Sequence, residues 1–510
     1  MGWKMMPSLT FIDRAIAWAF PRWGVARAAY RAQFRSYEAA RQDRMGDWYP
    51  VQNAPPETTD APHRSLIRAR TRDLERNGDV TEGVLDALIR NIIGSGYGLE
   101  AQVESARGLP LDMINDRIEA VWQAWCLAEN CDITGEHSFN ELLEMVLRRW
   151  EIDGEVFILK LTDPLGYIPL KLQVLEPDML AEDIFQCGSN YVFGGVEVDR
   201  YMRPVAYHFR PDPMPYLKSM EVVRIPESDV IHIFTKKRPH QIRGMPDMTV
   251  SMERNRNIQE YITSELQAAR TAAATPGFVT RQRGTGAAIG RVGKDTKTGQ
   301  VVEQIQSNTL TYLGPDEDVK FPQPGRPNAG APTFLSMILR LIGMSRGLSY
   351  ETVTRDLSKT NYSSHRGGQL EDRKTYLRKQ KKLIAKFCDR VYEQWFLEAA
   401  VLSGKLLLPS FFADERARKR YSLHRWSTPG WQWVDPVKEI QAVERQLALG
   451  VSTMAEICGE QGKDWYEVLR ERKREIEASR AMGIELPWFN PQMELTPIPP
   501  DEDEKEAKGE

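Results

Sequence analysis

The chain has 510 residues, 41% of them hydrophobic and 27% charged, an ordinary globular composition that excludes the disordered and collagen-like classes. Charged residues break every long apolar run before the roughly 20 residues of a membrane span, and Asp13 and Arg14 interrupt residues 9–20, so no span or secretory signal is expected and an intracellular origin follows. The net charge of −3 does not indicate a general nucleic-acid binder, and five scattered cysteines without a CxxC pair indicate reduced thiols.

The two ends of the chain differ in charge. The first 36 residues are basic (net +5) and carry several aromatic side chains, which fits contact with a membrane, nucleic acid or partner protein, and equally an arm packed on its own protein. Repeated prolines then predict an extended linker over residues 37–65. The last ten residues (net −4) favour a solvated acidic tail.

In the next part of the chain the apolar residues have helical spacing, and after it they alternate with polar residues. Apolar residues three and four positions apart predict helices over residues 64–76, 80–93, 113–127 and 139–150. From Glu155 the apolar period becomes two, which predicts strands at residues 170–174, 205–209 and 231–233. The sequence therefore predicts a mixed α+β lobe.

Two helices flank a short excursion in the middle of the chain. A helix over residues 249–275 carries a narrow, Ala-rich stripe that suits packing against another helix, and a helix over residues 334–346 is apolar on most faces. Residues 276–333 are rich in Gly and Pro with weak strand signals at 301–305 and 310–313. This excursion has a basic half (276–300, net +4) and an acidic half (301–320, net −3).

A turn region over residues 347–364 then precedes the longest predicted helix, residues 365–402. A last helical module begins at Asp435-Pro436 and contains possible capping boxes at Thr453–Glu456 and Asp464–Glu467. Its final helix is expected to end near Gly483.

Three motifs resemble catalytic or nucleotide-binding signatures, and each lacks an essential feature. A GxSxG string centres on Ser345, but a helix precedes it where a hydrolase needs a strand. A P-loop near Lys294 would need Gly at 288 and Ser or Thr at 295, and residues 94–98 favour a helix C-terminal turn over a dinucleotide turn. The seven histidines are isolated along the chain, so we expect no enzyme activity, metal or cofactor.

Several strings, in one order along the chain, resemble the portal proteins of lambda-type tailed bacteriophages. The most specific are residues 361–364 (NYSS) with Arg366, and residues 433–439 (WVDPVKE). The other matching strings are residues 68–74 (RARTRDL), 90–96 (RNIIGSG), 175–178 (LEPD), 195–199 (GVEVD), 203–208 (RPVAYH), 232–234 (HIF) and 241–246 (QIRGMP).

The resemblance implies an α+β portal fold with a mixed wing, a two-helix stem, a small β-containing clip, a long wing helix and a helical crown. In chain order, the expected segments are an N-terminal arm and linker (1–60), wing (61–247), first stem helix (248–275), clip (276–333), second stem helix (334–346), tunnel loop (347–366), long wing helix and connection (365–434), crown (435–490) and acidic tail (491–510).

The resemblance also implies a function and partners. A portal is a ring, usually of twelve subunits, at one capsid vertex of the virion, and it assembles in the host cytoplasm. It conducts double-stranded DNA during packaging and ejection, and it binds the terminase large subunit, head-completion or adaptor proteins, and the major capsid and scaffold proteins. No membrane partner is implied, and ATP hydrolysis belongs to the terminase.

Site residues follow from this mapping as predictions. In the tunnel loop, the side chains expected to face DNA are Arg355, Lys359, His365 and Arg366, and those expected to shape the turn are Asn361, Tyr362, Ser363 and Ser364, with Ser363 or Ser364 capping the long helix. In the clip, the cations expected to contact terminase or adaptor are Arg281, Arg283, Arg291, Lys294 and Lys297. The stem residues expected between subunits are Leu266, Ala269, Leu339 and Ile342.

Four alternatives remain open at this point. The tunnel loop is alternatively a plain connection buried under the wing. The chain is alternatively another phage structural or connector protein, or a packaging enzyme, although the last would need a P-loop and clustered carboxylates. A portal relic of a prophage or gene-transfer particle is also compatible with the strings.

Overall fold

The computed structural model describes residues 54–105, 111–210, 221–273, 330–358, 360–431, 436–460 and 465–483, together with the backbone of four short strands between residues 278 and 320. The chain divides into two compact units, Met1–Thr59 and Asp60–Glu510. Helices and antiparallel sheets both occur in the second unit, which confirms the predicted α+β class.

The first helices match the predicted periodicity. They are α3 (Pro56–Asn77), α4 (Asp79–Ile92), α5 (Asp112–Trp125) and α7 (Phe139–Asp153), and the four-residue α6 (Ala128–Cys131) was not predicted. Ser138 and Glu141 form a capping box at the start of α7, where each side chain accepts a hydrogen bond from the other residue's backbone N–H. The predicted linker was wrong over residues 56–65, because Pro56 at the first helical position needs no N–H partner and α3 continues through Pro62.

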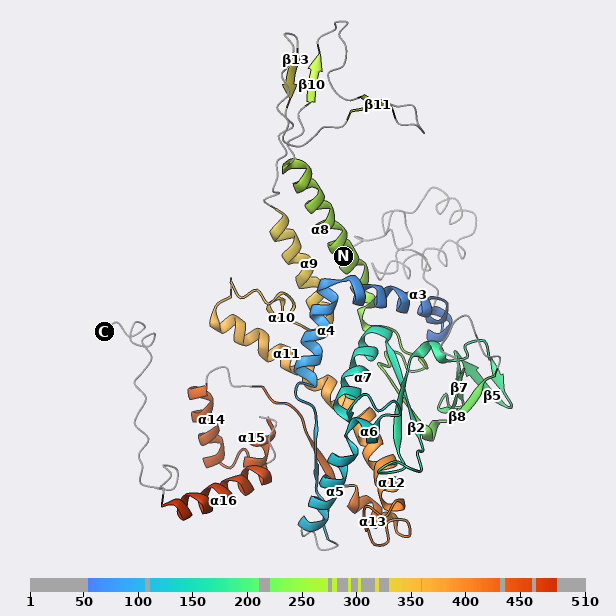
Figure 1. Cartoon of the computed structure of the whole chain (residues 1–510), viewed down its shortest axis with the longest axis vertical. Helices are drawn as coiled ribbons and strands as arrows, with labels where there is room; N and C mark the ends of the chain where they lie inside the picture. The colour runs from blue at the N-terminus through green and yellow to red at the C-terminus, as the bar shows by residue number, and fades with distance from the viewer. Residues whose placement is uncertain are drawn as a thin grey trace, which may run out of the picture. The chain divides into compact units, whose positions relative to one another are not determined.

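Two antiparallel sheets form the predicted strand region (Figure 1). The three-stranded sheet has the order β3 (Lys171–Leu175), β2 (Glu155–Leu161), β9 (Val230–Phe234). The five-stranded sheet runs in chain order through β4 (Gln186–Cys187), β5 (Asn190–Phe193), β6 (Val196–Val198), β7 (Pro204–Phe209) and β8 (Val223–Pro226). The strands predicted at 170–174, 205–209 and 231–233 are therefore confirmed, and β1 (Gly98–Ala101) pairs separately with β14 (His424–Ser427).

Helices dominate the remainder of the chain. They are α8 (Met252–Ala273), α9 (Ala331–Arg346), α10 (Tyr350–Thr354), α11 (Tyr362–Leu383), α12 (Leu397–Leu402), α13 (Glu415–Tyr421), α14 (Pro436–Ala448), α15 (Met454–Glu460) and α16 (Trp465–Met482). Two π-helical segments, Ile384–Cys388 and Arg390–Phe396, join α11 to α12, so the predicted long helix is continuous but begins three residues earlier. The sequence did not predict α10, which is a single short turn of helix.

The largest hydrophobic core lies where α4, α5, α7 and the α11–α12 helix meet β2 and β3. Trp122 is central to it, with its ring 4.8 Å from that of Phe396 and 5.1 Å from that of Phe139. A second core fills the space between the two sheets, where Phe157 of β2 stacks on His232 of β9 and meets Tyr207 of β7 edge-on. The helices and the sheets are thus held by separate cores that share strand β2.

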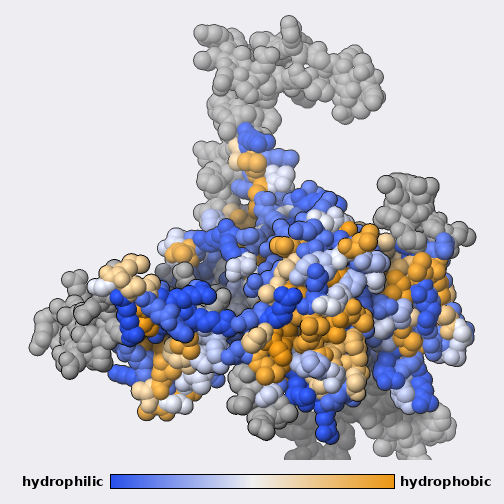
Figure 2. Space-filling model, turned by 60° about the horizontal axis from the view of Figure 1, so that its bottom comes forward, coloured by the Kyte–Doolittle hydropathy of each residue, from blue (hydrophilic) through white to orange (hydrophobic). Residues whose placement is uncertain are grey.

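Apolar side chains also remain exposed on this single chain. Figure 2 shows hydrophobic surface interspersed with hydrophilic surface on the face it presents. On and around α12 and α13, the exposed apolar residues are Leu402, Leu407, Phe412 and Leu423. Apolar residues exposed singly are common on protein surfaces, whereas large contiguous apolar patches mark sites that bind other chains.

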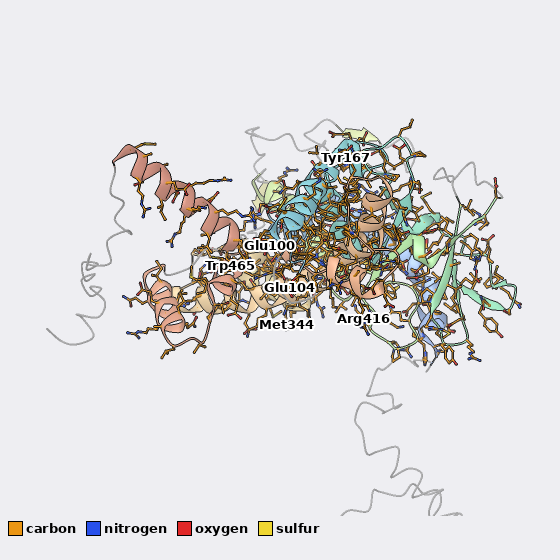
Figure 3. The ribbon with its side chains drawn as sticks, turned by 90° about the horizontal axis from the view of Figure 1, so that it is seen from below. Glu100, Glu104, Tyr167, Met344, Arg416 and Trp465 are labelled. Atoms are coloured by element: carbon orange, nitrogen blue, oxygen red, sulfur yellow. The ribbon has the colours of Figure 1, made fainter. Side chains whose placement is uncertain are left out.

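Helices α15 and α16 contact the rest of the second unit through polar groups. Arg470 of α16 pairs with Asp116 of α5 at 2.9 Å. Glu100, Glu104 and Trp465, labelled in Figure 3, line a pocket of about 310 Å³ between β1 and α16. The predicted capping box of α15 is confirmed, since Glu456 N–H donates to Thr453 Oγ1 at 3.2 Å and Thr453 N–H to the Glu456 carboxylate at 3.0 Å.

Three buried carboxylates lie in one five-residue stretch that joins α7 to β2. Glu151, Asp153 and Glu155 are each no more than 1% exposed, and we call residues 151–155 the acidic hub. Arg346 and Lys379 contact Glu151, and Arg72 of α3 pairs with Asp153 at 2.6 Å. Because a buried charge is costly unless it is paired, these contacts hold α3, α9 and α11 to the end of α7.

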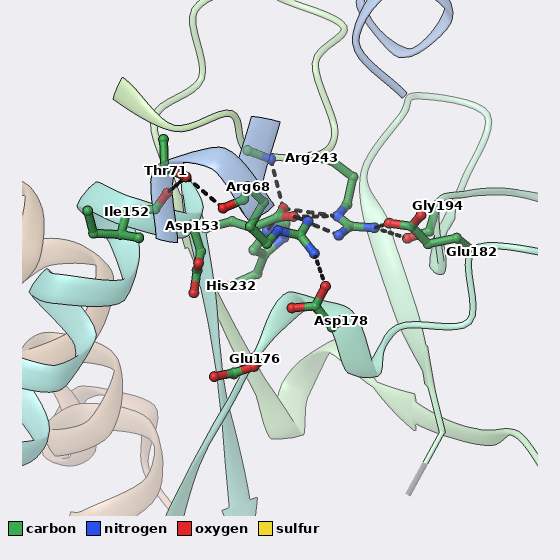
Figure 4. Close-up of polar contacts among 12 residues, drawn as sticks. Arg68, Thr71, Ile152, Asp153, Glu176, Asp178, Glu182, Gly194, His232 and Arg243 are labelled. Carbon is green, nitrogen blue, oxygen red and sulfur yellow. Dashed lines mark hydrogen bonds and ion pairs between the residues drawn. The ribbon is translucent and has the colours of Figure 1, made fainter. Parts of the chain in front are cut away.

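Glu155 has the densest set of partners in the acidic hub, and Figure 4 labels its partners Arg68, His232 and Arg243. Its carboxylate accepts from Arg243 Nη2 at 2.6 Å, from Gly244 N–H at 2.7 Å and from Arg68 Nη2 at 3.3 Å, and lies 3.1 Å from His232 Nε2. Burial acts to raise the pKa of the Glu155 carboxyl, but Arg243 and His232 outweigh burial and hold that pKa well below its usual range. The group is therefore an anion that ties α3, β9 and the Arg243 loop to strand β2.

Replacing Gly154 by Ala is expected to destabilise the protein strongly. Gly154 has a φ of +83°, and an added Cβ would collide with the backbone of Met245. Gly188→Ala is the matched control, because its φ of +58° is also left-handed but nothing lies within 4 Å of the added Cβ. In urea unfolding, Gly188→Ala should cost about 1 kcal/mol, and Gly154→Ala about 1–3 kcal/mol more because of overpacking. Equal losses would contradict the close packing at Gly154.

Replacing Glu155 by Gln is expected to lower the free energy of unfolding by about 3–5 kcal/mol, because it removes the buried counter-charge of Arg68 and Arg243 and leaves them only partly exposed carboxylates as partners. Glu182→Gln is the control: Glu182 pairs with the same Arg243 at 3.2 Å, but its side chain is 44% exposed. An exposed pair contributes only about 0–1 kcal/mol. If urea unfolding gives the two variants the same small loss, the acidic hub does not stabilise the fold as described.

Candidate functional site

Helices α8 and α9, which correspond to the predicted stem, pack against each other and expose apolar side chains. Tyr261 and Phe334 meet across the pair with ring centroids 5.6 Å apart. Ile258, near the start of α8, is buried, whereas the next stripe positions, Ile262 and Leu266, are 49% and 50% exposed. On α9, Phe334 and Met337 are similarly exposed. Most of the described stripe beyond Ile258 is therefore exposed on one chain, since Ala269 is exposed as well.

The four predicted stem residues do not share one environment. Leu266 and Ala269 are exposed and Leu339 is half-buried, so these three are available to a neighbouring molecule. Ile342 is fully buried within the chain, and its assignment to a subunit interface was wrong. The reason is that the last turn of α9 already packs on the rest of its own chain, where Arg346 contacts Glu151.

The segment predicted as the tunnel loop contains the short helix α10 and is hydrogen-bonded to α11. Asp372 of α11 accepts hydrogen bonds from Ser349 N–H at 2.7 Å, Ser349 Oγ at 2.7 Å and Thr352 Oγ1 at 2.6 Å. Ser349 itself caps α10. The buried Asp372 carboxylate thus fastens the first half of this segment to the long helix.

Asn361, one of the predicted turn-shaping residues, is the N-cap of α11. Its Oδ1 accepts from Ser364 N–H at 2.8 Å. The predicted capping role of Ser363 or Ser364 was wrong, because the helix already begins at Tyr362 and both serines lie within its first turn. Both serines are exposed, and the Tyr362 side chain lies outside the described residues.

The predicted DNA-facing residues lie in different settings. Arg355 ends α10 with a φ of +56°, and its 62%-exposed side chain pairs with Asp86 of α4. His365 lies 2.9 Å from the Gln369 side chain and, like Arg366, is half-buried. Lys359 lies outside the described residues. Their role toward DNA stays a prediction.

The described strands of residues 276–333 form two short antiparallel pairs. β10 (Phe278–Arg281) pairs with β13 (Glu317–Lys320), and β11 (Val292–Lys294) pairs with β12 (Val301–Glu303). In the register, Arg281 is opposite Glu317 and Lys294 is opposite Val301. The backbones of the basic and acidic halves therefore pair as strands within one chain. Arg283, Arg291 and Lys297 lie outside the described residues.

The rejected hydrolase motif is confirmed to be helical. Ser345 lies inside α9, and its Oγ donates to the carbonyl of Ile342 at 2.7 Å. The predicted turn after α4 is also confirmed, since Gly94 and Gly96 both have positive φ just beyond the helix. None of the helices in the described ranges has the length and hydropathy of a membrane span.

Sequence spacing missed one group of potential metal ligands. Cys187, Glu197 and His208 come from β4, β6 and β7, and strand pairing brings their ligand atoms within 4.8 Å of one another. The Glu197 carboxylate already accepts from Arg224 Nε at 2.7 Å and from Asn190 Nδ2 at 2.7 Å. The Arg224 hydrogen bond, the largest influence, holds the pKa of Glu197 at about 2. Arg224 thus supplies the positive charge that a metal would otherwise bring.

Comparison with known proteins identifies the family. The family model described as phage portal protein, lambda family, matches residues 41–380. The probable portal protein of Halomonas phage phiHAP-1 is 27% identical, over 93% of this chain and 93% of that protein. Portal protein B of Escherichia phage lambda is 22% identical, over 85% of this chain and 88% of that protein.

Among solved structures, a chain in the neck of an empty GTA particle is 14% identical and has a TM-score of 0.44, covering 82% of this chain and 96% of that chain. The family model alone spans well over half of the present chain. The strings that carried the resemblance at residues 68–74 and 241–246 include Arg68 and Arg243, both partners of Glu155. The chain belongs to the lambda family of phage portal proteins.

Proposed function

We propose that copies of this chain form a closed ring, of twelve subunits as is usual in the family, at one capsid vertex of a virion. Family membership supports the role, and the uncovered apolar stripe of α8 and α9 supports the ring. Ile262, Leu266, Phe334 and Met337 are 45–52% exposed on this pair of helices. A chain whose apolar face meets a different face of its neighbour generates a ring when the rotation closes.

The ring would conduct double-stranded DNA during packaging and ejection, with residues 347–366 facing the channel. A channel that bound phosphates tightly would hold DNA instead of letting it slide, so its lining should be mixed in sign. Arg355 supports this, because its exposed guanidinium is paired with Asp86, which also lies 3.4 Å from Arg90. The Asp372 contacts to Ser349 and Thr352 would keep this segment in place as DNA moves past.

The strand pairs within residues 276–333 would form the clip, where the terminase large subunit and later the head-completion or adaptor proteins dock. Major capsid and scaffold proteins would bind elsewhere on the ring, and assembly would take place in the host cytoplasm. The exposed apolar residues around α12 and α13 are available for such contacts. The proposal assigns the chain no catalytic step, so energy for translocation would come from the terminase.

Placing charges on the stem stripe is expected to prevent ring formation. Ile262→Glu combined with Leu266→Glu replaces two side chains that would each contribute about 1.5–3 kcal/mol per interface when fully buried. Native mass spectrometry should show monomers for this variant where the parent forms rings. Thr263→Glu combined with Ser264→Glu is the control, because it adds the same charges at exposed polar positions of the same helix. Rings of normal mass from the stripe variant would contradict the proposed interface.

Removing two tunnel-loop cations is expected to reduce the length or retention of packaged DNA while rings still form. The variant combines Arg355→Ala with Lys359→Ala, and the measurement is the size of nuclease-protected DNA. Asp86→Asn is the control, since it breaks the Arg355–Asp86 pair but keeps both cations. If Asp86→Asn reproduces the defect, or if the double variant retains a full genome, these residues do not act on DNA.

A further inference from the structure

A strongly basic pocket lies at the end of α9 that is nearest α11. It has a volume of about 390 Å³ and includes residues of α9, α11, the segment after β9 and the turn at Asp247. Met344, labelled in Figure 3, lies at its surface and is 71% exposed. We call it the basic pocket, and the proposed function described above makes no use of it.

Cations outnumber anions in this pocket. Five cationic residues line it: Lys237, Arg346, Arg378, Lys379 and Lys382. Asp247 is the single acid in the lining, and it pairs with Lys237 at 2.8 Å. The carboxylate of Glu151 contacts Arg346 and Lys379. Two carboxylates against five cationic residues leave an excess of two to three positive charges around one concave space, because burial lowers the pKa of Lys379 to about 7.

The buried part of the pocket contains an unused hydrogen-bond donor. Arg346 is only 6% exposed, and one of its terminal nitrogens contacts Glu151. Its Nε–H has no hydrogen-bond partner among the described residues. Since a buried donor without a partner is costly, an acceptor bound in the pocket within reach of this N–H would stabilise it.

The cationic side chains of the basic pocket also repel one another. Burial, followed by the neighbouring Arg346, lowers the pKa of Lys379, and burial followed by Arg378 and Lys379 lowers that of Lys382. Burial likewise lowers the pKa of Arg346 to about 10, so its guanidinium remains charged at neutral pH. An anion in the pocket would offset this repulsion and accept from the free Nε–H.

We propose that the basic pocket binds a phosphate group. Phosphate offers only acceptor oxygens at neutral pH and carries up to two negative charges, which suits a guanidinium and several ammonium donors in one concavity. Arg346 and Lys379 would contact it from the buried side, and Arg378 and Lys382, both exposed, from the rim. The phosphate is either free inorganic phosphate or a backbone phosphate of DNA, and the experiment below separates the two.

The test is isothermal titration of the full chain with sodium phosphate at constant ionic strength, with chloride as the balancing anion. We expect saturable binding of one phosphate per chain. Arg378→Gln combined with Lys382→Gln should weaken it at least about tenfold, since each substitution removes a charged donor from the rim. Lys374→Gln combined with Lys381→Gln is the control, because it removes the same charge from exposed positions of α11 outside the pocket.

The parent and the two double variants are then titrated in the same way with a short DNA duplex. If only the rim variant loses DNA affinity, and phosphate competes with DNA, the ligand is a backbone phosphate. If both double variants bind DNA equally while only the rim variant loses phosphate, the ligand is free phosphate. Thermal melting followed by circular dichroism verifies that each variant is folded. If the rim double variant has a lowered melting temperature, Lys382→Gln alone is titrated in its place. Absence of saturable phosphate binding by the parent, or equal phosphate affinity of the two double variants, overturns the proposal.

Discussion

Three buried carboxylates within five residues hold the second unit of this chain together. Glu155 ties α3 and the Arg243 loop to strand β2, and Glu151, four residues earlier, contacts the last residue of α9 and Lys379 of α11. Gly154 lies between them in a left-handed conformation that a side chain would not fit. The turn at Gly154 therefore joins two sets of contacts. Those of Glu155 hold strand β2 to its neighbours, and those of Glu151 hold the buried end of α9.

This anchoring bears directly on the proposed ring. The buried end of α9 contacts Glu151, whereas the apolar side chains farther along α8 and α9 are half exposed. The buried end of α9 is thus held in place within its own chain, while the exposed apolar side chains of α8 and α9 are left for neighbouring subunits to cover. The buried Asp372 carboxylate acts similarly on the next segment, because it fixes α10 against α11. Rigid attachment of both segments would give every subunit the same geometry at the channel.

The sequence predicted most helices and strands because their apolar periodicity is local. It missed the acidic hub because the partners of Glu155 lie 77 to 89 residues away along the chain. The periodicity of apolar residues reports local structure and does not indicate which distant residues pair. The Cys187–Glu197–His208 group escaped notice for the same reason, since only strand pairing brings it together. Ile342 was assigned to a subunit interface because an apolar helix face does not reveal which neighbour covers it. The family strings led to the expected stem and tunnel loop, but not to the contacts that hold these segments in place.

A cryo-electron microscopy reconstruction of the purified full chain tests the central claim most directly, because it shows assembly and the contacts within each subunit together. We expect a closed ring in which Ile262 and Leu266 lie between neighbouring subunits and Glu151 still contacts Arg346 inside each one. A monomer, an open filament, or a ring in which the α8 stripe faces solvent would contradict the account.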